Sequence, residues 1–384
     1  MPEKIVISFD DDEEEPLKPF PQGISEPEKI AEEIHPLNSL PKGTKYLDCY
    51  YDSPLKYPSG IDKSFYIHKT ISLKDTFTNT LLETSSHIIA SSASGSIFFI
   101  NKKTGNIDER FNYKEQKFEK TGVVISDEAY INSTDKIYKI SNLKSEEIYF
   151  TEKGTYIWTD LNYEDKLVFL EYNPDEGKII LNVSFKKIEI ASGSAPPGSV
   201  LISPYGYCIV TDKEFLLIDK KDFSRKSFPI FPSEEKYFLF NAQKIFFIQN
   251  NDEIYYYDNE NKIRYSGIRN KFLNSLASFG QNIFLGNLFG WDAYTFTGNL
   301  VSSHRENSPC EILALSDNII CIGMDNDLLL HNMNKLSEAE TVFIKSENGF
   351  DKVISALISR NAIYALTKNG TFAEIYNSKL NIKI

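Results

Sequence analysis

The sequence predicts an all-β fold: an eight-bladed β-propeller preceded by an acidic, proline-rich N-terminal extension. Three observations lead to this prediction. Short apolar runs rich in Ile, Phe, Tyr and Val recur from residue 69 to residue 384, and such runs are typical of strands. They return about every forty residues, which is roughly the length of a four-stranded blade. No helical periodicity lies between them, which favours a propeller over a sandwich.

Two kinds of run can be recognised in the repeats. The first is strongly apolar, and its copies are residues 87–90, 129–131, 167–170, 207–210, 245–248, 283–285, 319–322 and 362–366. The second follows within the same repeat, and its copies are residues 95–101, 136–140, 178–181, 214–218, 253–257, 291–294, 327–330 and 370–375. Polar or glycine-containing breaks, such as 173–177 and 368–370, separate the runs and predict turns.

The number of repeats sets the number of blades. We count about eight repeats, each long enough for four strands, and seven blades is the alternative because the third repeat is irregular. A ring of blades buries both faces of each sheet and exposes only short edges. We expect residues 65–73 (FYIHKTISL) to close the ring by pairing with the last blade, within a propeller domain spanning residues 64–384.

One repeat carries a more specific pattern. In residues 95–107, GSIFFINKKTGNI, a strand opens at Gly95 and ends at Asn101, and a turn is closed by Thr104 and Gly105. This stretch resembles the repeat of the quinoprotein-like (PQQ-like, WD40-like) propellers, and residues 297–299 match it in part. The tryptophan that usually follows the turn in that family is missing here. The resemblance implies a fold rather than a function.

Within that family, a resemblance to the quinoprotein dehydrogenases would imply bound pyrroloquinoline quinone and calcium. They carry adjacent cysteines and stacking tryptophans, whereas this chain has no Cys-Cys pair and only two tryptophans, Trp158 and Trp291. Its five histidines show no metal-binding spacing, and no phosphate loop or nucleophile elbow is visible. We therefore expect a non-catalytic member of the family, with no cofactor and no metal.

Composition and charge limit the classes of partner that the chain is expected to bind. The chain is 41% apolar and 25% charged, with a net charge of −12, which disfavours nucleic acid as a partner. No apolar run is long enough for a membrane helix, and the N-terminus lacks a signal-peptide pattern. The four cysteines lie far apart and are expected to be reduced thiols. These features predict a cytoplasmic protein without membrane insertion.

The N-terminal residues 1–63 differ from the rest. They contain nine of the sixteen prolines, and fourteen acidic against seven basic residues. Such a composition predicts a partly disordered arm. A capping Ser25 with Pro27 and early acids predicts a short helix near 26–34.

Two places are candidate partner-binding sites. Near the N-terminus, a short β-prone segment precedes an unbroken acidic run; its residues are Ile5, Ile7, Phe9, Asp10, Asp11, Asp12, Glu13, Glu14 and Glu15. Such a peptide could add a strand to a partner's sheet edge, with the acids selecting a basic rim; the alternative is a solubilising tail. Trp291, in the aromatic stretch Phe289-Gly290-Trp291, is a candidate interface residue, or else a residue that packs one blade on another.

These observations together predict a scaffold or adaptor subunit of a larger complex. Protein partners would bind the propeller faces and the N-terminal peptide. The alternative function is a ligand-binding or hydrolytic propeller with a site in the central channel, where one residue from each blade could converge.

Overall fold

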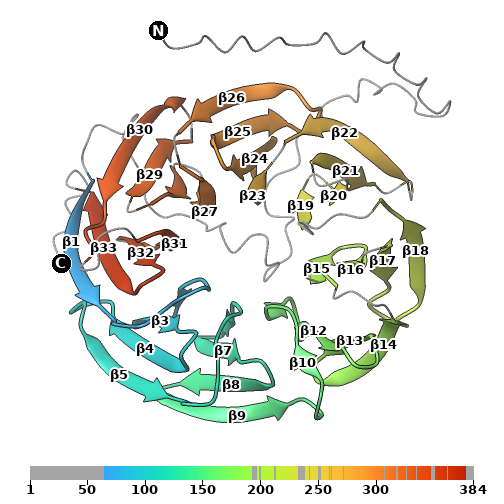
Figure 1. Cartoon of the computed structure of the whole chain (residues 1–384), viewed down its shortest axis with the longest axis horizontal. Coiled ribbons are helices and arrows are strands. Elements are labelled where there is room, and N and C mark those ends of the chain that lie inside the picture. The colour runs from blue at the N-terminus through green and yellow to red at the C-terminus, as the bar shows by residue number, and fades with distance from the viewer. Residues whose placement is uncertain are drawn as a thin grey trace, which may run out of the picture. The chain divides into compact units, whose positions relative to one another are not determined.

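The computed structural model of the chain describes most of the propeller. The described residues are 65–192, 197–198, 200–211, 213–231, 238–241, 243–249, 252–258, 260, 262–270, 272–306, 308–316, 319–325, 327–333, 335–346, 351–360 and 362–377. The arm of residues 1–63, including the helix expected near 26–34, lies outside them. Within the described part of the chain the regular elements are all strands, arranged as eight sheets around a centre (Figure 1).

The first four blades each run from an inner strand to an outer strand in sequence order. Blade 1 contains β2 (Leu82–Glu83), β3 (His87–Ser91), β4 (Ser96–Asn101) and β5 (Ile107–Asn112). Blade 2 contains β6 (Val123–Ile125), β7 (Glu128–Asn132), β8 (Lys136–Ser141) and β9 (Lys144–Phe150). Blade 3 contains β10 (Tyr156–Ile157), β11 (Asn162–Tyr163), β12 (Leu167–Asn173), β13 (Lys178–Val183) and β14 (Lys186–Ser192). Blade 4 contains β15 (Val200–Ser203), β16 (Gly206–Val210), β17 (Glu214–Ile218) and β18 (Arg225–Pro229).

The remaining four blades follow the same order until the last one. Blade 5 contains β19 (Phe238–Asn241), β20 (Lys244–Gln249), β21 (Glu253–Tyr257) and β22 (Ile263–Arg269). Blade 6 contains β23 (Leu273–Phe279), β24 (Asn282–Asn287), β25 (Gly290–Thr295) and β26 (Leu300–Arg305). Blade 7 contains β27 (Glu311–Leu315), β28 (Ile319–Gly323), β29 (Asp327–Asn332) and β30 (Lys335–Phe343). Blade 8 contains β31 (Val353–Ile358), β32 (Ile363–Thr367), β33 (Thr371–Asn377) and, as its outer strand, β1 (Phe65–Ser72).

Blade 8 joins the two ends of the described chain. β1 pairs antiparallel with β33, from Phe65 opposite Asn377 to Ser72 opposite Thr371. Figure 1 shows these two strands, one blue and one red, side by side. The pairing makes the first strand of the chain the outer strand of the last blade, so the ring is closed by backbone hydrogen bonds.

The predicted all-β, eight-bladed fold is confirmed. The two kinds of apolar run form the second and third strands of the blades, and these strands are buried on both faces, as in β16 and β17. The irregular third repeat is still a blade: its inner strand is split into β10 and β11, which both pair with β12. The seven-bladed alternative is therefore wrong.

The core is divided among the blade interfaces. The described residues form eight hydrophobic clusters, and each cluster joins side chains of two neighbouring blades. Each fully buried large apolar side chain contributes about 1.5–3 kcal/mol, so the blades stabilise one another around the ring. The described cysteines Cys208, Cys310 and Cys321 are buried in these interfaces.

Because neighbouring strands of a blade alternate in direction, the connections sort onto two faces of the ring. We call the face with the turns between first and second strands and between third and fourth strands the lower face. The upper face carries the turns between second and third strands and the links between blades. No helix in the described part of the chain is long and apolar enough to span a membrane.

Candidate functional site

The structure places the predicted partner-binding residues in two different situations. Ile5, Ile7, Phe9 and the acidic run 10–15 lie outside the described residues. Trp291 is fully buried in the cluster between blades 6 and 7. Its assignment as an interface residue is corrected accordingly, because a side chain without exposed surface cannot contact a partner in this arrangement.

Trp291 is held in that position by a buried histidine. Its indole Nε1–H donates to Nε2 of His331 at 3.2 Å, and Nδ1 of His331 lies 2.9 Å from the carbonyl of Leu336. Because an indole nitrogen can only donate, Nε2 of His331 is the acceptor and Nδ1 carries the proton. Burial lowers the pKa of His331 to about 4, which keeps the ring neutral. This contact between β25 and β29 fixes blade 6 against blade 7.

The exposed aromatic residue of this stretch is Phe289. Asn287 pairs with Gly290 across β24 and β25, which leaves Leu288 and Phe289 as the two residues of a tight turn on the upper face. Leu288 is 37% exposed and Phe289 is 59% exposed. Two-residue turns normally carry Gly, Asn or Asp, so an apolar pair at the tip departs from the local preference.

Gly290 makes this turn possible. Its φ of 134° is one that residues with a side chain rarely adopt, and a Cβ there would lie 2.0 Å from the carbonyl oxygen of His304. Only glycine therefore allows β25 to approach β26 directly after the apolar tip.

A second exposed aromatic side chain stands beside the turn. Phe272 is 58% exposed and precedes β23, and its ring centroid lies 6.1 Å from that of Phe289 in an edge-to-face arrangement. Its φ of 61° is in the left-handed region, which is unfavourable for a bulky residue. We call Phe272, Leu288 and Phe289 the aromatic turn.

A buried carboxylate supports the aromatic turn from below. Asp292 is 3% exposed. Its Oδ2 accepts from the Asn270 and Asn287 side-chain amides at 3.0 and 3.2 Å. Its Oδ1 accepts from Ser303 at 2.7 Å and pairs with Arg305 at 2.9 Å. We call these five residues the Asp292 cluster; it joins the segment before Phe272 to the turn that carries Phe289.

The cluster also fixes the turn backbone. Asn287 uses its amide nitrogen to bind Asp292 and its oxygen Oδ1 to accept from the backbone N–H of Phe289 at 2.9 Å. The backbone N–H of Glu306 then donates to the carbonyl of Phe289 at 3.0 Å. Phe289 is therefore exposed at its ring and anchored at both backbone groups.

Two arginines flank the aromatic turn, Arg269 at the end of β22 and Arg305 at the end of β26. Arg305 pairs with Asp292, and Arg269 pairs with Asp252 at 2.7 Å. Both arginine side chains are 61% exposed, whereas the two aspartates are almost buried. The guanidinium groups are thus the exposed members of these two ion pairs.

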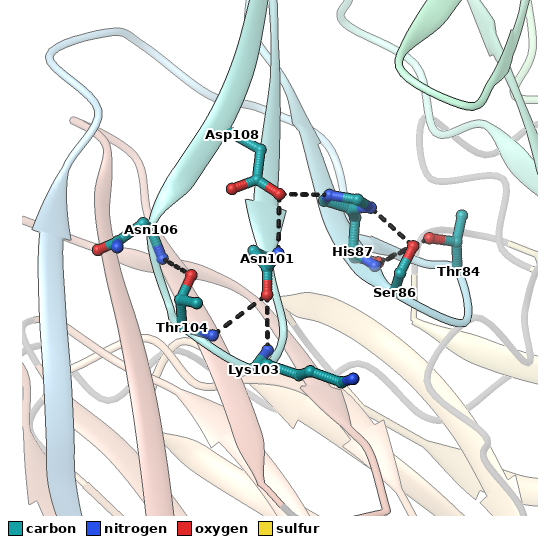
Figure 2. A network of polar contacts seen from close by, with 8 residues as sticks. All are labelled: Thr84, Ser86, His87, Asn101, Lys103, Thr104, Asn106 and Asp108. Atoms are coloured by element: carbon teal, nitrogen blue, oxygen red, sulfur yellow. Dashed lines mark hydrogen bonds and ion pairs between the residues drawn. The ribbon is translucent and has the colours of Figure 1, made fainter.

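The sequence motif of the first blade forms a different site on the lower face, shown in Figure 2. Asn101 ends β4, and its Oδ1 accepts from the backbone N–H groups of Lys103 and Thr104 at 2.9 and 3.1 Å. The Thr104 hydroxyl accepts from the backbone of Asn106 at 3.2 Å. The Asn and Thr of the motif therefore build the turn itself, as side chains of this kind do in Asx turns.

The same network reaches a histidine. The Asn101 amide donates to Asp108 at 2.7 Å, and Nε2 of His87 lies 2.9 Å from the same carboxylate oxygen. The hydrogen bond from Asn101, and then that from His87, lowers the pKa of Asp108. Nδ1 of His87 lies 2.8 Å from the Ser86 hydroxyl (Figure 2). A Ser–His–Asp series alone does not make a hydrolase, because acyl transfer also needs donors aimed at an oxyanion.

A site in the centre of the ring would draw on carboxylates of the inner strands. Those of the described inner strands are Glu83 on β2 and Glu311 on β27. Glu83 pairs with Lys102, and Glu311 pairs with Lys352 at 2.8 Å. Across the described part of the chain, no group of three or more His, Cys, Asp and Glu side chains is placed to hold a metal ion.

Comparisons with known proteins identify the fold. A scan against protein families finds no match, and a search of curated proteins finds no similar sequence. The structure is similar to BamB from Moraxella catarrhalis, with a TM-score of 0.61 and 11% identity, over 81% of this chain and 99% of that one. It is also similar to the computationally designed protein Ika8, with a TM-score of 0.65 and 11% identity, over 79% and 97%.

A third structure is more distant. It is a catalytically inactive virginiamycin B lyase from Staphylococcus aureus with quinupristin, at a TM-score of 0.49 and 13% identity, over 66% of this chain and 92% of that one. At these identities the likeness to BamB and to Ika8 shows the propeller fold alone.

Sequence reasoning found the right stretch of blade 6 but not the exposed residues. Phe289 lies two positions before Trp291, in the stretch that the sequence marks as aromatic. The position of Phe289 in the sequence could have indicated its exposure. Leu288 and Phe289 are an apolar pair between Asn287 and Gly290, where a turn is expected. Phe272 gave no such signal, because its exposure depends on the fold.

Proposed function

We propose that this chain is a non-catalytic scaffold or adaptor that binds a protein partner through the aromatic turn on its upper face. The observation that carries this proposal is the exposed pair Phe272 and Phe289, standing on the buried Asp292 cluster. The likeness to BamB supports a propeller fold, which is compatible with this role.

The shape of the aromatic turn favours a protein over a small molecule. Small-molecule sites are concave and enclose most of the ligand, whereas these rings project from a turn and a link between blades. Exposed aromatic side chains are typical hot spots of protein interfaces. Because the Asp292 cluster already fixes the backbone, little conformational entropy is lost when a partner binds.

The flanking charges indicate the chemistry of the partner. Arg269 and Arg305 present exposed guanidinium groups on the strands that precede Phe272 and follow the Phe289 turn. A partner segment that combines apolar or aromatic side chains with nearby carboxylates matches both features. We therefore expect an acidic segment with apolar anchors, and not a basic or a purely polar one.

Photo-crosslinking tests this proposal at a defined residue. The photoreactive residue benzoylphenylalanine replaces Phe289 in the full-length protein, and the crosslinked segment is identified by mass spectrometry after irradiation in the native source. The matched control places the same residue at Phe343, which is also 59% exposed but lies on β30 at the rim of blade 7.

The expected result is a protein adduct at position 289, absent at position 343, whose segment carries carboxylates beside apolar side chains. The adduct should disappear when Phe272→Ser is added. Equal adducts at both positions, or an adduct with a basic segment, would contradict the proposal.

A further inference from the structure

A pocket of about 500 Å³ opens between blades 1 and 2 on the lower face. Its apolar floor is formed by Ile89, Phe99 and Ile140, three residues of the cluster that joins these blades. One wall is His87, whose ring lies between Ser86 and Asp108 in Figure 2. A pocket of this volume is within the usual range for ligand sites, about 300–1,000 Å³.

Two tight turns of blade 2 form the rim. The turn between β6 and β7 contains Ser126 and Asp127, with φ of 49° and 71°, and the turn between β8 and β9 contains Asn142 and Leu143, with φ of 50° and 56°. Left-handed backbone at all four non-glycine residues is unfavourable and is kept only where the surroundings define it. Leu143 stands 36% exposed at the edge of this rim.

The charge of the pocket is negative. Both oxygens of Asp127 accept from Ser85, one from its backbone N–H and one from its hydroxyl at 2.6 Å. These hydrogen bonds lower the pKa of Asp127, the hydroxyl first, so the carboxylate is ionised at neutral pH. Ser85 contributes no positive charge; Lys102, which pairs with Glu83, and His87 lie close enough to act on Asp127 electrostatically. The second rim carboxylate, Glu128, pairs with Lys139 at 2.8 Å.

A second carboxylate, Asp108, lies behind the His87 wall of the pocket. Asp108 is bound by His87 and the neutral amide of Asn101. Asp108 and Asp127 are thus two carboxylates whose hydrogen-bond donors here are a serine, an amide and an imidazole. A positively charged group entering the pocket would meet Asp127 directly, because Asp127 lines the pocket and is exposed at its rim. Asp108 is behind His87 and would act on that group from a greater distance.

We propose that this pocket binds a positively charged group carried on an aliphatic stem, with guanidinium as the best-fitting head. The stem lies on Ile89, Phe99 and Ile140, and the head is bound at the rim by Asp127. Leu143 covers the stem from the solvent side. The same chemistry occurs in an arginine side chain of a peptide and in a free alkylguanidine. This site is independent of the aromatic turn, which lies on the other face.

Methyl NMR of the full-length protein tests the proposal, because Ile89 and Ile140 report directly from the pocket floor. The probe is acetyl-Gly-Arg-Gly-amide, and its neutral isostere contains citrulline in place of arginine. Agmatine is the free alkylguanidine. We expect the arginine peptide to shift both isoleucine methyl signals and to bind at least about tenfold more tightly than the citrulline peptide.

Substitutions identify the residues that contact the arginine peptide. Asp127→Asn should weaken the arginine peptide about tenfold, whereas Glu109→Gln, on the exposed strand β5, should leave its affinity unchanged. Leu143→Gly is a second variant that should fold normally, since glycine adopts the observed φ without strain. It should also weaken binding, because the cover over the stem is lost.

The two probes separate the sources of the ligand. Binding of the peptide but not of agmatine assigns the pocket to a protein partner, and agmatine binding with equal affinity assigns it to a free alkylguanidine; both support the proposal. Equal shifts with arginine and citrulline, or no shift of Ile89 and Ile140 with any probe, would overturn it.

Discussion

The aromatic turn of blade 6 and the pocket between blades 1 and 2 are built in opposite ways. The aromatic turn exposes apolar rings and buries a carboxylate, Asp292, beneath them. The pocket exposes carboxylates at its rim and buries apolar side chains at its floor. The first projects from the upper face, and the second is a hollow in the lower face.

One fold can therefore support two kinds of recognition. In each region the buried half fixes the exposed half: the Asp292 cluster anchors the backbone of Phe289, and the apolar cluster beneath the pocket holds the rim turns. A projecting apolar surface suits a protein, whereas a negative hollow suits a small cation. The following experiments separate the two regions, beginning with the largest expected effect.

Asp292→Ala should cause the largest loss of folding stability. It removes the acceptor of four donors and leaves Asn270 and Asn287 without their buried partner. We expect the free energy of unfolding in urea to fall by about 4 kcal/mol, as is usual when a buried charged network loses one member. Ser303→Ala, which removes one donor of the same cluster, should cost about 1 kcal/mol. Equal costs for the two variants would contradict the central role of Asp292.

Gly290→Ala should damage the aromatic turn without affecting the pocket. The added Cβ would meet the carbonyl of His304, and the φ of 134° would be strained, so we expect a loss of about 3 kcal/mol in thermal or urea unfolding. Gly280→Ala is the matched control: its φ is 57°, and a Cβ there meets no atom within 4 Å. It should cost about 1 kcal/mol. An unchanged stability of Gly290→Ala would be inconsistent with the close approach of residue 290 to the His304 carbonyl on β26.

Acid should weaken the interface between blades 6 and 7 through His331. Folded His331 has a pKa of about 4, below the ordinary 6.5, so between these values the unfolded chain binds more protons. The stabilising contribution is complete above pH 6.5 and is lost as pH falls toward 4, by about 3 kcal/mol. His331→Gln can still accept from Trp291 but does not titrate. Urea unfolding between pH 7 and 4 should therefore show this loss in the wild type and lack it in the variant.

Phe289→Ser should have the smallest effect on stability and a large effect on recognition. Its ring is mostly exposed, so the free energy of unfolding should change by less than about 0.5 kcal/mol. Crosslinking from a photoreactive residue in place of Leu288 should nevertheless lose its protein adduct. Unchanged crosslinking in a normally folded variant would remove Phe289 from the interface.

Much of the fold could be predicted from the sequence because the second and third strands of each blade are buried on both faces. Runs such as 207–210 are continuous and apolar for that reason. Outer strands such as β5, IDERFN, are exposed and carry no such pattern. Their place in the blade depends on pairing with a neighbour, which a single segment does not reveal.

The sites were less predictable because they depend on distances between remote residues. Trp291 and Phe289 are two positions apart, yet one packs on His331, forty residues away, and the other reaches solvent. Ser85 and Asp127 are 42 residues apart and meet only because consecutive blades are neighbours. The Thr-Gly motif marked the correct turn of blade 1, but its link to His87 needed the fold.

Calorimetry with the segment that crosslinks at position 289 measures whether the aromatic turn is a docking surface. The segment is made as a synthetic peptide and titrated into the wild type, Phe289→Ser and Phe343→Ser. If the aromatic turn is the docking surface, Phe289→Ser should bind about 30-fold more weakly, as expected for a hot spot, and Phe343→Ser should bind like the wild type. Equal affinity for all three proteins would contradict the account.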